Sequence, residues 1–333
     1  MMRHLSAQEA GRWHASLSPE RRLATLSPDY VIGDALRDPA LRPCFLGYRE
    51  DGQFWMHGVH RANIPGMDCL DQQSPYGYGG PSSNSDSPDF LARAWQAYVL
   101  MCRDEGVLAE FIRLHPLAHA SSAYGGLNRH DRQTVALDLR CPDLRASYSG
   151  RCRTSIRKAE RAGLTVRVVA AEDISRRFGA FYRAGMRALG AHAFFAFNDA
   201  YFSNFEKWDC AQLFVCELNG EWLAAGLFLT DGTVMEYHLS ASTDEGRKYG
   251  ATNLLLDAAA HEARRRGCAT LYLGGGSDTR EDNSLLTFKS SFSDVRHPFE
   301  IGFTAFADDR YQALKDEFIQ QGKTVNRFLF YRE

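Results

Sequence analysis

The sequence predicts an α+β fold with two similar halves, each a mixed, mostly antiparallel sheet flanked by helices. The clearest evidence lies at 211–242, where three β-rich segments are joined by the turns Asn219-Gly220 and Asp231-Gly232. Such Xaa-Gly pairs favour tight hairpin turns, because glycine adopts positive φ without strain. Consecutive hairpins predict antiparallel strands in this part of the sheet.

The second half continues with a helix and one more strand. The segment 247–252 leads into an Ala/Leu-rich helix, and the β-rich stretch 268–276 ends in three glycines. The segment 285–292, which carries Phe288 and Lys289, comes next. We interpret this continuous succession of elements as the part of the chain that carries the chemistry.

The first half repeats this order less clearly. A hairpin with the turn Asp51-Gly52 is followed by a glycine-rich segment at 75–81 and by a helix that Ser87 or Asp89 is expected to cap. A strand at 107–114 follows that helix, as the glycine-ended strand follows the later one. The alternating residues at 132–139 are expected to close this half.

Length and composition allow two domains and exclude several classes of protein. The chain has 333 residues, of which 44% are apolar, and we place the domains at 1–145 and 146–333. A net charge of −2 excludes a generally basic nucleic-acid binder, and no DNA partner is expected. No apolar run approaches the ~18 residues of a membrane span. Together with eight scattered cysteines, these features predict a cytoplasmic protein without disulfides or a metal site.

A basic helix is expected at the start of the second domain. Helical spacing places Arg153, Arg157 and Arg161 on one face at i, i+4 and i+8, and Gly163 fits the C′ position. Aligned arginines repel one another unless an anion or a carboxylate lies opposite. The stripe is therefore either a phosphate-binding surface for a substrate or a solvated face beside Glu160.

The segment 247–252 resembles the pyrophosphate loop R-x-x-G-x-G/A of acetyltransferases. Arg247 and Gly250 match this pattern, and Lys248 adds a second cation, whereas Thr252 stands where a small residue is expected. Backbone N–H groups at a helix start favour an anion. The alternative is a helix start at which Gly250 simply makes a turn.

Other polar residues carry weaker signals. His115 and His238 lie at the ends of expected strands, and Gly275 lies in a glycine run that could leave room for a ligand. No Ser-His-Asp or Cys-His arrangement has family-specific flanks, so a covalent acyl-enzyme is not favoured. Direct attack of an amine on a bound ester or thioester fits better.

Several short segments, none of them distinctive alone, occur in a characteristic order over roughly residues 40–310. They are 75–81, 155–163, 186–191, 237–242, 249–256, 273–276 and 286–293. Together they resemble the FemABX family, whose members are tandem proteins of the GCN5-related N-acetyltransferase (GNAT) fold. The compact bacterial branch is the most similar, since no heptad segment interrupts 164–212.

The resemblance implies an acyltransferase that forms an amide bond by moving an aminoacyl group from aminoacyl-tRNA to an amine. It places the family's Phe-Lys pair, the expected catalytic residues, on Phe288 and Lys289, where the lysine would face donor phosphate or developing negative charge. It places a substrate-phosphate arginine on Arg187. It also implies catalysis by positioning and backbone polarisation rather than by a strong side-chain base, with tRNA as co-substrate and without a cofactor.

The remaining expected contacts are divided between donor and acceptor. Donor-binding residues would be Arg247, Lys248, Gly250 and Gly275. Substrate-binding residues would be Tyr76, Tyr78, Arg153, Arg157, Arg187, Tyr237 and His238. The acceptor is a muropeptide, an amino sugar or a natural-product scaffold. An acyl-CoA-dependent N-acyltransferase and a non-catalytic tandem scaffold are the alternatives.

Overall fold

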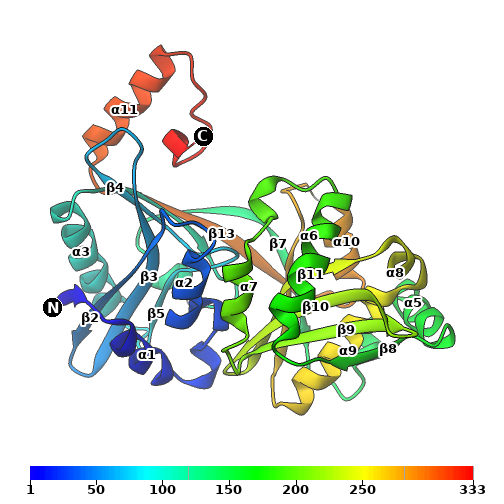
Figure 1. The fold of residues 1–333 in the computed structure, drawn as a ribbon. Coiled ribbons are helices and arrows are strands. Elements are labelled where there is room, and N and C mark those ends of the chain that lie inside the picture. Colours follow the sequence, from blue (N-terminus) through cyan, green and yellow to red (C-terminus); the bar gives the residue numbers. More distant parts are fainter. Residues whose placement is uncertain (119, 281, 333) are drawn as a thin grey trace. The chain divides into compact units, whose positions relative to one another are not determined.

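The structure is a computed structural model that describes residues 1–118, 120–280 and 282–332 (Figure 1). The chain forms two compact units, one of Met1–Asp131 with Pro298–Glu333 and the other of Arg132–His297. This division differs from the ranges 1–145 and 146–333, because the C-terminal segment belongs to the first unit.

The first unit contains a mixed sheet with the strand order β1-β2-β3-β4-β6-β13, and β5 pairs with β3. All pairs are antiparallel except β4 with β6. The strands are β1 (Met2–His4), β2 (Arg42–Glu50), β3 (Gln53–Asn63), β4 (Leu70–Gln73), β5 (Pro81–Ser83), β6 (Val107–Leu114) and β13 (Arg296–Ala305).

The second unit has the order β8-β9-β10-β11-β12-β7, in which only β11 and β12 are parallel. Its strands are β7 (Leu127–Asp138), β8 (Thr165–Val168), β9 (Ala211–Leu218), β10 (Glu221–Asp231), β11 (Val234–Ser242) and β12 (Thr270–Gly275). Strand order and pairing sense are thus the same in both units, and the predicted α+β repeat is confirmed.

The last strand of each sheet departs from the expected chain order. Residues 134–138 of β7 pair with β12 in the second unit, so the alternation at 132–139 does not close the first half. The corresponding position in the first unit is taken by β13, which pairs with β6 over residues 300–305. The first half of the sequence therefore supplies β7, the last strand of the second unit's sheet. The second half supplies β13, the last strand of the first unit's sheet.

Three helices of the first unit begin at serine caps. Ser6 forms a capping box with Glu9, and Ser27 and Ser87 each precede a proline at the first helical turn. These caps fix where the three helices begin, and Phe90 and Tyr98 of the third one belong to the same apolar cluster as Trp55 of β3. The helices are α1 (Ala7–Ala15), α2 (Pro28–Ala35), α3 (Pro88–Asp104), α4 (Ala120–Ala123) and α11 (Asp308–Gln320).

Helices cover both faces of the second sheet. Gly185 of α6 approaches Ala241, whereas Leu255 of α9 approaches Gly226, the partner of Ser240. Neighbouring residues of a strand point to opposite faces, so α6 and α9 lie on opposite sides. The helices are α5 (Gly150–Arg161), α6 (Gly179–Ala188), α7 (Asp199–Phe205), α8 (Asp244–Tyr249), α9 (Ala251–Arg265) and α10 (Ser284–Ser290). Within the described residues, none of the helices could cross a bilayer.

Candidate active site

The parallel strands β11 and β12 of the second unit separate soon after they meet. They pair only over Val234–Glu236. Beyond this point β11 remains bonded to β10, while β12 continues along β7 through Gly275. Beyond Glu236, no strand among the described residues pairs with the edge of β11 that faces β12, and backbone polar groups at such an edge can bind a ligand.

A β-bulge lies at the start of this opening. Leu227 pairs with Leu239 and Phe228 with Tyr237, which leaves His238 as the extra residue on β11. Bulges redirect side chains and are frequent beside active sites. The Nε2 atom of His238 lies 2.7 Å from the hydroxyl of Tyr201 on α7, which holds the ring in place.

Tyr237 is the other polar residue at the bulge. Its hydroxyl donates to Ser240, and burial raises the pKa of Tyr237 to about 12. The phenol is thus protonated at neutral pH. Tyr237 also packs against the same apolar core as Tyr249 and Phe288, so all three rings border one cluster.

The glycine run at the end of β12 fits closely between its neighbours. Gly274 has a φ of 75°, which strains other residues. A Cβ atom on Gly275 would lie 3.1 Å from Cδ of Arg132, and one on Gly276 would lie 2.6 Å from Oδ1 of Asn283. Asn283 in turn caps α10 by accepting from Leu285 and Leu286, so the glycines allow α10 to dock at the strand end.

Lys289 and Gly275, predicted separately as catalytic and donor-binding residues, are in direct contact. Nζ of Lys289 donates to the Gly275 carbonyl oxygen at 2.7 Å, and the side chain is only 8% exposed. Burial, with a smaller contribution from Arg132, lowers the pKa of Lys289 to about 7. Phe288 lies beside it, half-buried against Phe292. The amine can therefore exchange a proton near neutral pH.

This lowered pKa predicts a pH-dependent stability. Between pH 7 and the ordinary value of 10.5, the unfolded chain binds a proton at Lys289 that the folded protein releases. The free energy of unfolding should therefore rise with pH in this window, by up to about 1.4 kcal/mol per pH unit. Urea unfolding of wild type and Lys289→Met at several pH values tests this, and equal pH slopes in the two proteins would refute it.

The predicted donor loop is divided by Gly250, which separates α8 from α9. Arg247 is directed back onto its own helix, where it pairs with Asp244 and donates to the Ser242 carbonyl oxygen at 2.8 Å. Lys248 is exposed, and its carbonyl oxygen accepts from Nζ of Lys158 at 2.7 Å. The loop is thus bound to helix α5.

Gly250 itself faces α5. It has a φ of 79°, and a Cβ atom would lie 2.9 Å from the carbonyl oxygen of Ser155. Gly250→Ala should lower the free energy of unfolding by roughly 2–3 kcal/mol, from left-handed strain and this contact. Gly267→Ala is the matched control, since Gly267 has a φ of 85° and open space around it. Equal losses in the two variants would show that the contact with α5 costs nothing.

The arginine stripe lies on α5 as the spacing predicts. The helix buries Cys152, Ile156 and Ala159, which leaves its basic residues on the outer face. Arg153 and Arg157 line a surface pocket of about 350 Å³. Its other lining residues are Asp143, Arg145 and Ala146. Arg161 lies farther along the helix, outside this lining, and Arg187 is exposed in the last turn of α6.

Tyr76 and Tyr78 belong to the first unit and lie beside a cationic cluster that the sequence did not indicate. The Asp34 carboxylate accepts from the Tyr76 amide at 2.9 Å and from Nε of Arg37 at 3.0 Å. Burial, and then the charge of Arg37, lower the pKa of Arg113 nearby. Two guanidinium groups thus lie near the Asp34 carboxylate, and Asp131 is a second carboxylate whose charge acts on Arg113.

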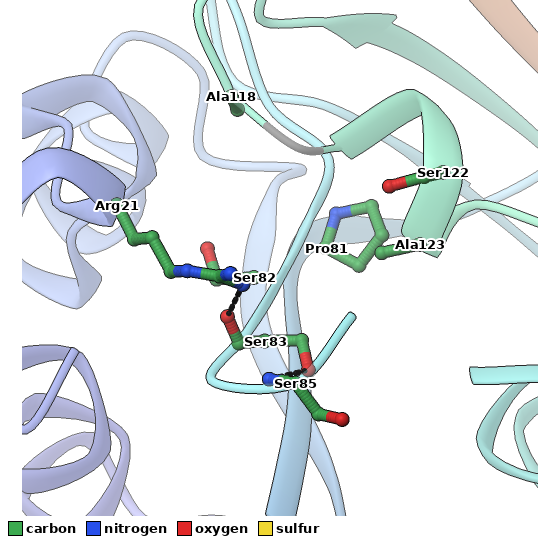
Figure 2. Close-up of a pocket in the computed structure, with 8 residues that line it drawn as sticks. All are labelled: Arg21, Pro81, Ser82, Ser83, Ser85, Ala118, Ser122 and Ala123. Carbon is green, nitrogen blue, oxygen red and sulfur yellow. Dashed lines mark hydrogen bonds between the residues drawn. The ribbon is translucent and has the colours of Figure 1, made fainter. Parts of the chain in front are cut away.

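His115, in the same unit, is held by contacts of the kind that structural histidines make. Its side chain is buried, its Nδ1 accepts from the Leu117 amide at 3.1 Å, and its ring packs edge-on against Tyr78. These contacts account for the residue without a catalytic role. A small pocket elsewhere in this unit, lined by Arg21 and Ser83 among others, encloses about 10 Å³ (Figure 2). Such a volume holds about one water molecule, too little for a substrate.

Comparison with known proteins agrees with this geometry. Residues 146–289 match the family model described as an acetyltransferase (GNAT) domain, a range that lies within the second unit and ends at Lys289. FemX is similar over 95% of this chain and 100% of its own, with a TM-score of 0.73 and 14% sequence identity. The chain has a tandem GNAT fold. The predicted resemblance to FemABX proteins is thereby confirmed at the level of fold.

Two further solved structures share the tandem GNAT fold over most of their length. One is the C-terminal domain of a putative lysylphosphatidylglycerol synthetase from Agrobacterium fabrum, with 15% identity, a TM-score of 0.58, and 94% and 98% of the two chains covered. The other is a tandem GNAT protein from the clavulanic acid biosynthesis pathway, with 11% identity, a TM-score of 0.51, and coverage of 92% and 98%. No curated protein sequence matches the chain significantly.

Proposed function

We propose that this tandem GNAT protein is an aminoacyltransferase that moves an aminoacyl group from aminoacyl-tRNA to an amine acceptor and so forms an amide bond. The likeness to FemX in fold and the contact between Lys289 and Gly275 at the opening of β11 and β12 support this. Charged tRNA as the donor would place the reaction in the cytoplasm.

The packing around Gly250 is the observation that favours aminoacyl-tRNA over CoA as the donor. A CoA diphosphate needs close access to the backbone at a helix start. Here the Ser155 carbonyl oxygen lies 2.9 Å from the position of a Cβ on Gly250, so α5 covers this side of the loop. Arg247 is paired with Asp244, and Thr252 adds bulk where the acetyltransferase pattern has a small residue. These contacts favour a donor other than CoA.

The chemistry needs a deprotonated amine and a polarised ester carbonyl. The amine nitrogen bonds to the ester carbonyl carbon, the ester C–O bond breaks, and the ribose hydroxyl of the tRNA leaves. Neutral Lys289 can accept the proton of the attacking amine and return it to the leaving oxygen, because its pKa is about 7. Open backbone groups of β11 would polarise the carbonyl, and Phe288 and Tyr237 would border the acyl group.

The acceptor is proposed to carry an anionic group. The guanidinium groups of Arg37 and Arg113, beside Tyr76 and Tyr78, have the geometry to bind a phosphate or carboxylate by paired hydrogen bonds. A muropeptide, an amino sugar derivative or a natural-product scaffold can each supply such a group. Arg187 and His238 remain proposed substrate contacts within the second unit.

An acyl-CoA-dependent N-acyltransferase is the second candidate. The matched family model is that of an acetyltransferase domain, and Arg247 and Gly250 retain part of the pyrophosphate pattern. This function would require Arg247 to leave Asp244 and the loop to open away from α5.

Transfer of a radiolabelled amino acid from a pool of charged tRNAs to candidate amines tests the proposal. Product formation that RNase treatment abolishes is expected. Transfer that survives RNase and depends on added acyl-CoA would instead establish the second candidate.

A further inference from the structure

Helix α5 concentrates positive charge in a chain that is slightly acidic overall. Its twelve residues contain five basic residues and one acidic residue, a net charge of +4, whereas the whole chain has a net charge of −2. Ser149 caps the helix by accepting from Cys152, so its start is fixed by local bonds. The charge is therefore presented on a defined surface.

The arginines that line the pocket beside α5 differ in their interaction partners. Arg145 is neutralised by Asp257 at 2.6 Å and Glu160 at 2.8 Å. Among the described residues, Arg153 donates to backbone carbonyl oxygens, those of Tyr148 and Arg145. Arg157 has no hydrogen bond or ion pair to any other described residue. The pocket of about 350 Å³ thus holds two arginines without an ion pair, and Asp143 is the acidic residue in its lining.

Further basic residues lie close to this pocket. Lys158 joins α5 to the exposed Lys248 of α8 through the Lys248 carbonyl oxygen, and the two helices lie side by side in Figure 1. In addition, Arg264 of α9 donates to the carbonyl oxygens of Cys141 and Pro142, which directly precede the pocket residue Asp143. We call this surface the basic track; it consists of Lys248, Lys158, Arg161, Arg157, Arg153 and Arg264.

We infer that the basic track binds successive backbone phosphates of an RNA near its acceptor end. This rests on the proposed function and names the surface that would hold the donor's RNA portion. Arginines at i, i+4 and i+8 are spaced by about 6 Å along the helix, a linear row that suits a polyanionic strand. Guanidinium groups also form paired hydrogen bonds with phosphate oxygens.

An anionic membrane is the competing partner for a basic helix. Helices that lie on membranes insert large apolar side chains between the lipids. Among the described residues, the exposed large apolar side chains lie outside α5, α8 and α9. The surface therefore offers charge without apolar anchors, which favours RNA.

Binding of an uncharged RNA minihelix with a single-stranded 3′ end, followed by fluorescence anisotropy at several salt concentrations, tests this inference. The triple variant Arg153→Gln, Arg157→Gln, Arg161→Gln should bind more weakly, and its slope of log affinity against log salt should fall by about two to three. A matched control removes three positive charges from the first unit: Arg310→Gln, Lys315→Gln, Lys323→Gln. The control should retain most of the wild-type slope.

Three results would overturn the inference. These are equal slopes in wild type and the triple variant, an equal loss in the control, and binding of phosphatidylglycerol vesicles in place of the minihelix. Because the minihelix is not aminoacylated, the assay is independent of the transfer chemistry. RNase-sensitive transfer together with equal slopes would reject the basic track and leave the proposed function intact.

Discussion

Replacing Lys289 with alanine is expected to lower the rate of transfer at least tenfold while the protein remains folded. Lys289 is buried, contacts the Gly275 carbonyl oxygen, and has a pKa near 7, so it can both accept a proton and carry positive charge during the reaction. A tenfold loss corresponds to about 1.4 kcal/mol of transition-state stabilisation. Steady-state kcat and kcat/KM measure it.

Two further variants separate chemistry from packing. Lys289→Met keeps most of the side-chain volume and removes the amine, so it should be as inactive as the alanine variant. Lys207→Ala removes an exposed lysine of the same unit and should retain full activity. Unchanged turnover in Lys289→Met would remove Lys289 from the catalytic residues.

Replacing Arg332 with glutamine is expected to lower the free energy of unfolding of the first unit by about 3 kcal/mol. Arg332 forms a two-point ion pair with Asp71, whose side chain is fully buried on β4. Burial raises the pKa of Asp71 even with Arg332 present, so the carboxylate is costly without it. Urea unfolding followed by circular dichroism measures the loss.

A double variant identifies the source of this loss. Asp71→Asn combined with Arg332→Gln should recover part of the stability, because no charge remains buried. Arg327→Gln, near the same C-terminus, is the control. A loss in Arg332→Gln within 0.5 kcal/mol of zero, as for an ordinary surface change, would show that the C-terminal segment does not stabilise the first unit.

Local patterns of the sequence predicted local structure well. Asn219 and Gly220 both have positive φ, as do Asp51 and Gly52, in agreement with the expected hairpin turns. At the third turn only Gly232 does, so the hairpin is confirmed with a different turn type. Ser87 caps its helix, and Gly163 follows α5 with a φ of 80°. Each of these features depends on a few neighbouring residues.

Contacts between distant segments could not be predicted in the same way. The exchange of β7 and β13 depends on pairing between residues far apart in the chain, for which hydropathy alternation contains no partner information. The chain divides into α8 and α9 at Gly250, whose backbone is left-handed, and this glycine packs against Ser155, about 95 residues away in sequence. Propensity alone favours a single helix start there.

In the candidate site, too, the sequence did not predict which distant residues come into contact. The resemblance located Lys289 and Gly275 separately, whereas their hydrogen bond and the lowered pKa follow from burial in the folded unit. Arg37, just after helix α2, and Arg113, near the end of β6, were missed because a single arginine at such a position is not distinctive. Only the fold brings both of them near Asp34.

If the donor is an aminoacylated RNA, transfer should be supported by a charged RNA and not by a CoA thioester. Transfer to the same amine would be measured from an aminoacylated RNA minihelix, from the full-length charged tRNA and from acetyl-CoA. We expect the minihelix to support transfer nearly as well as the full tRNA, because a chain with net charge −2 should contact only the acceptor end. Efficient transfer from acetyl-CoA, with none from either RNA, would contradict the account.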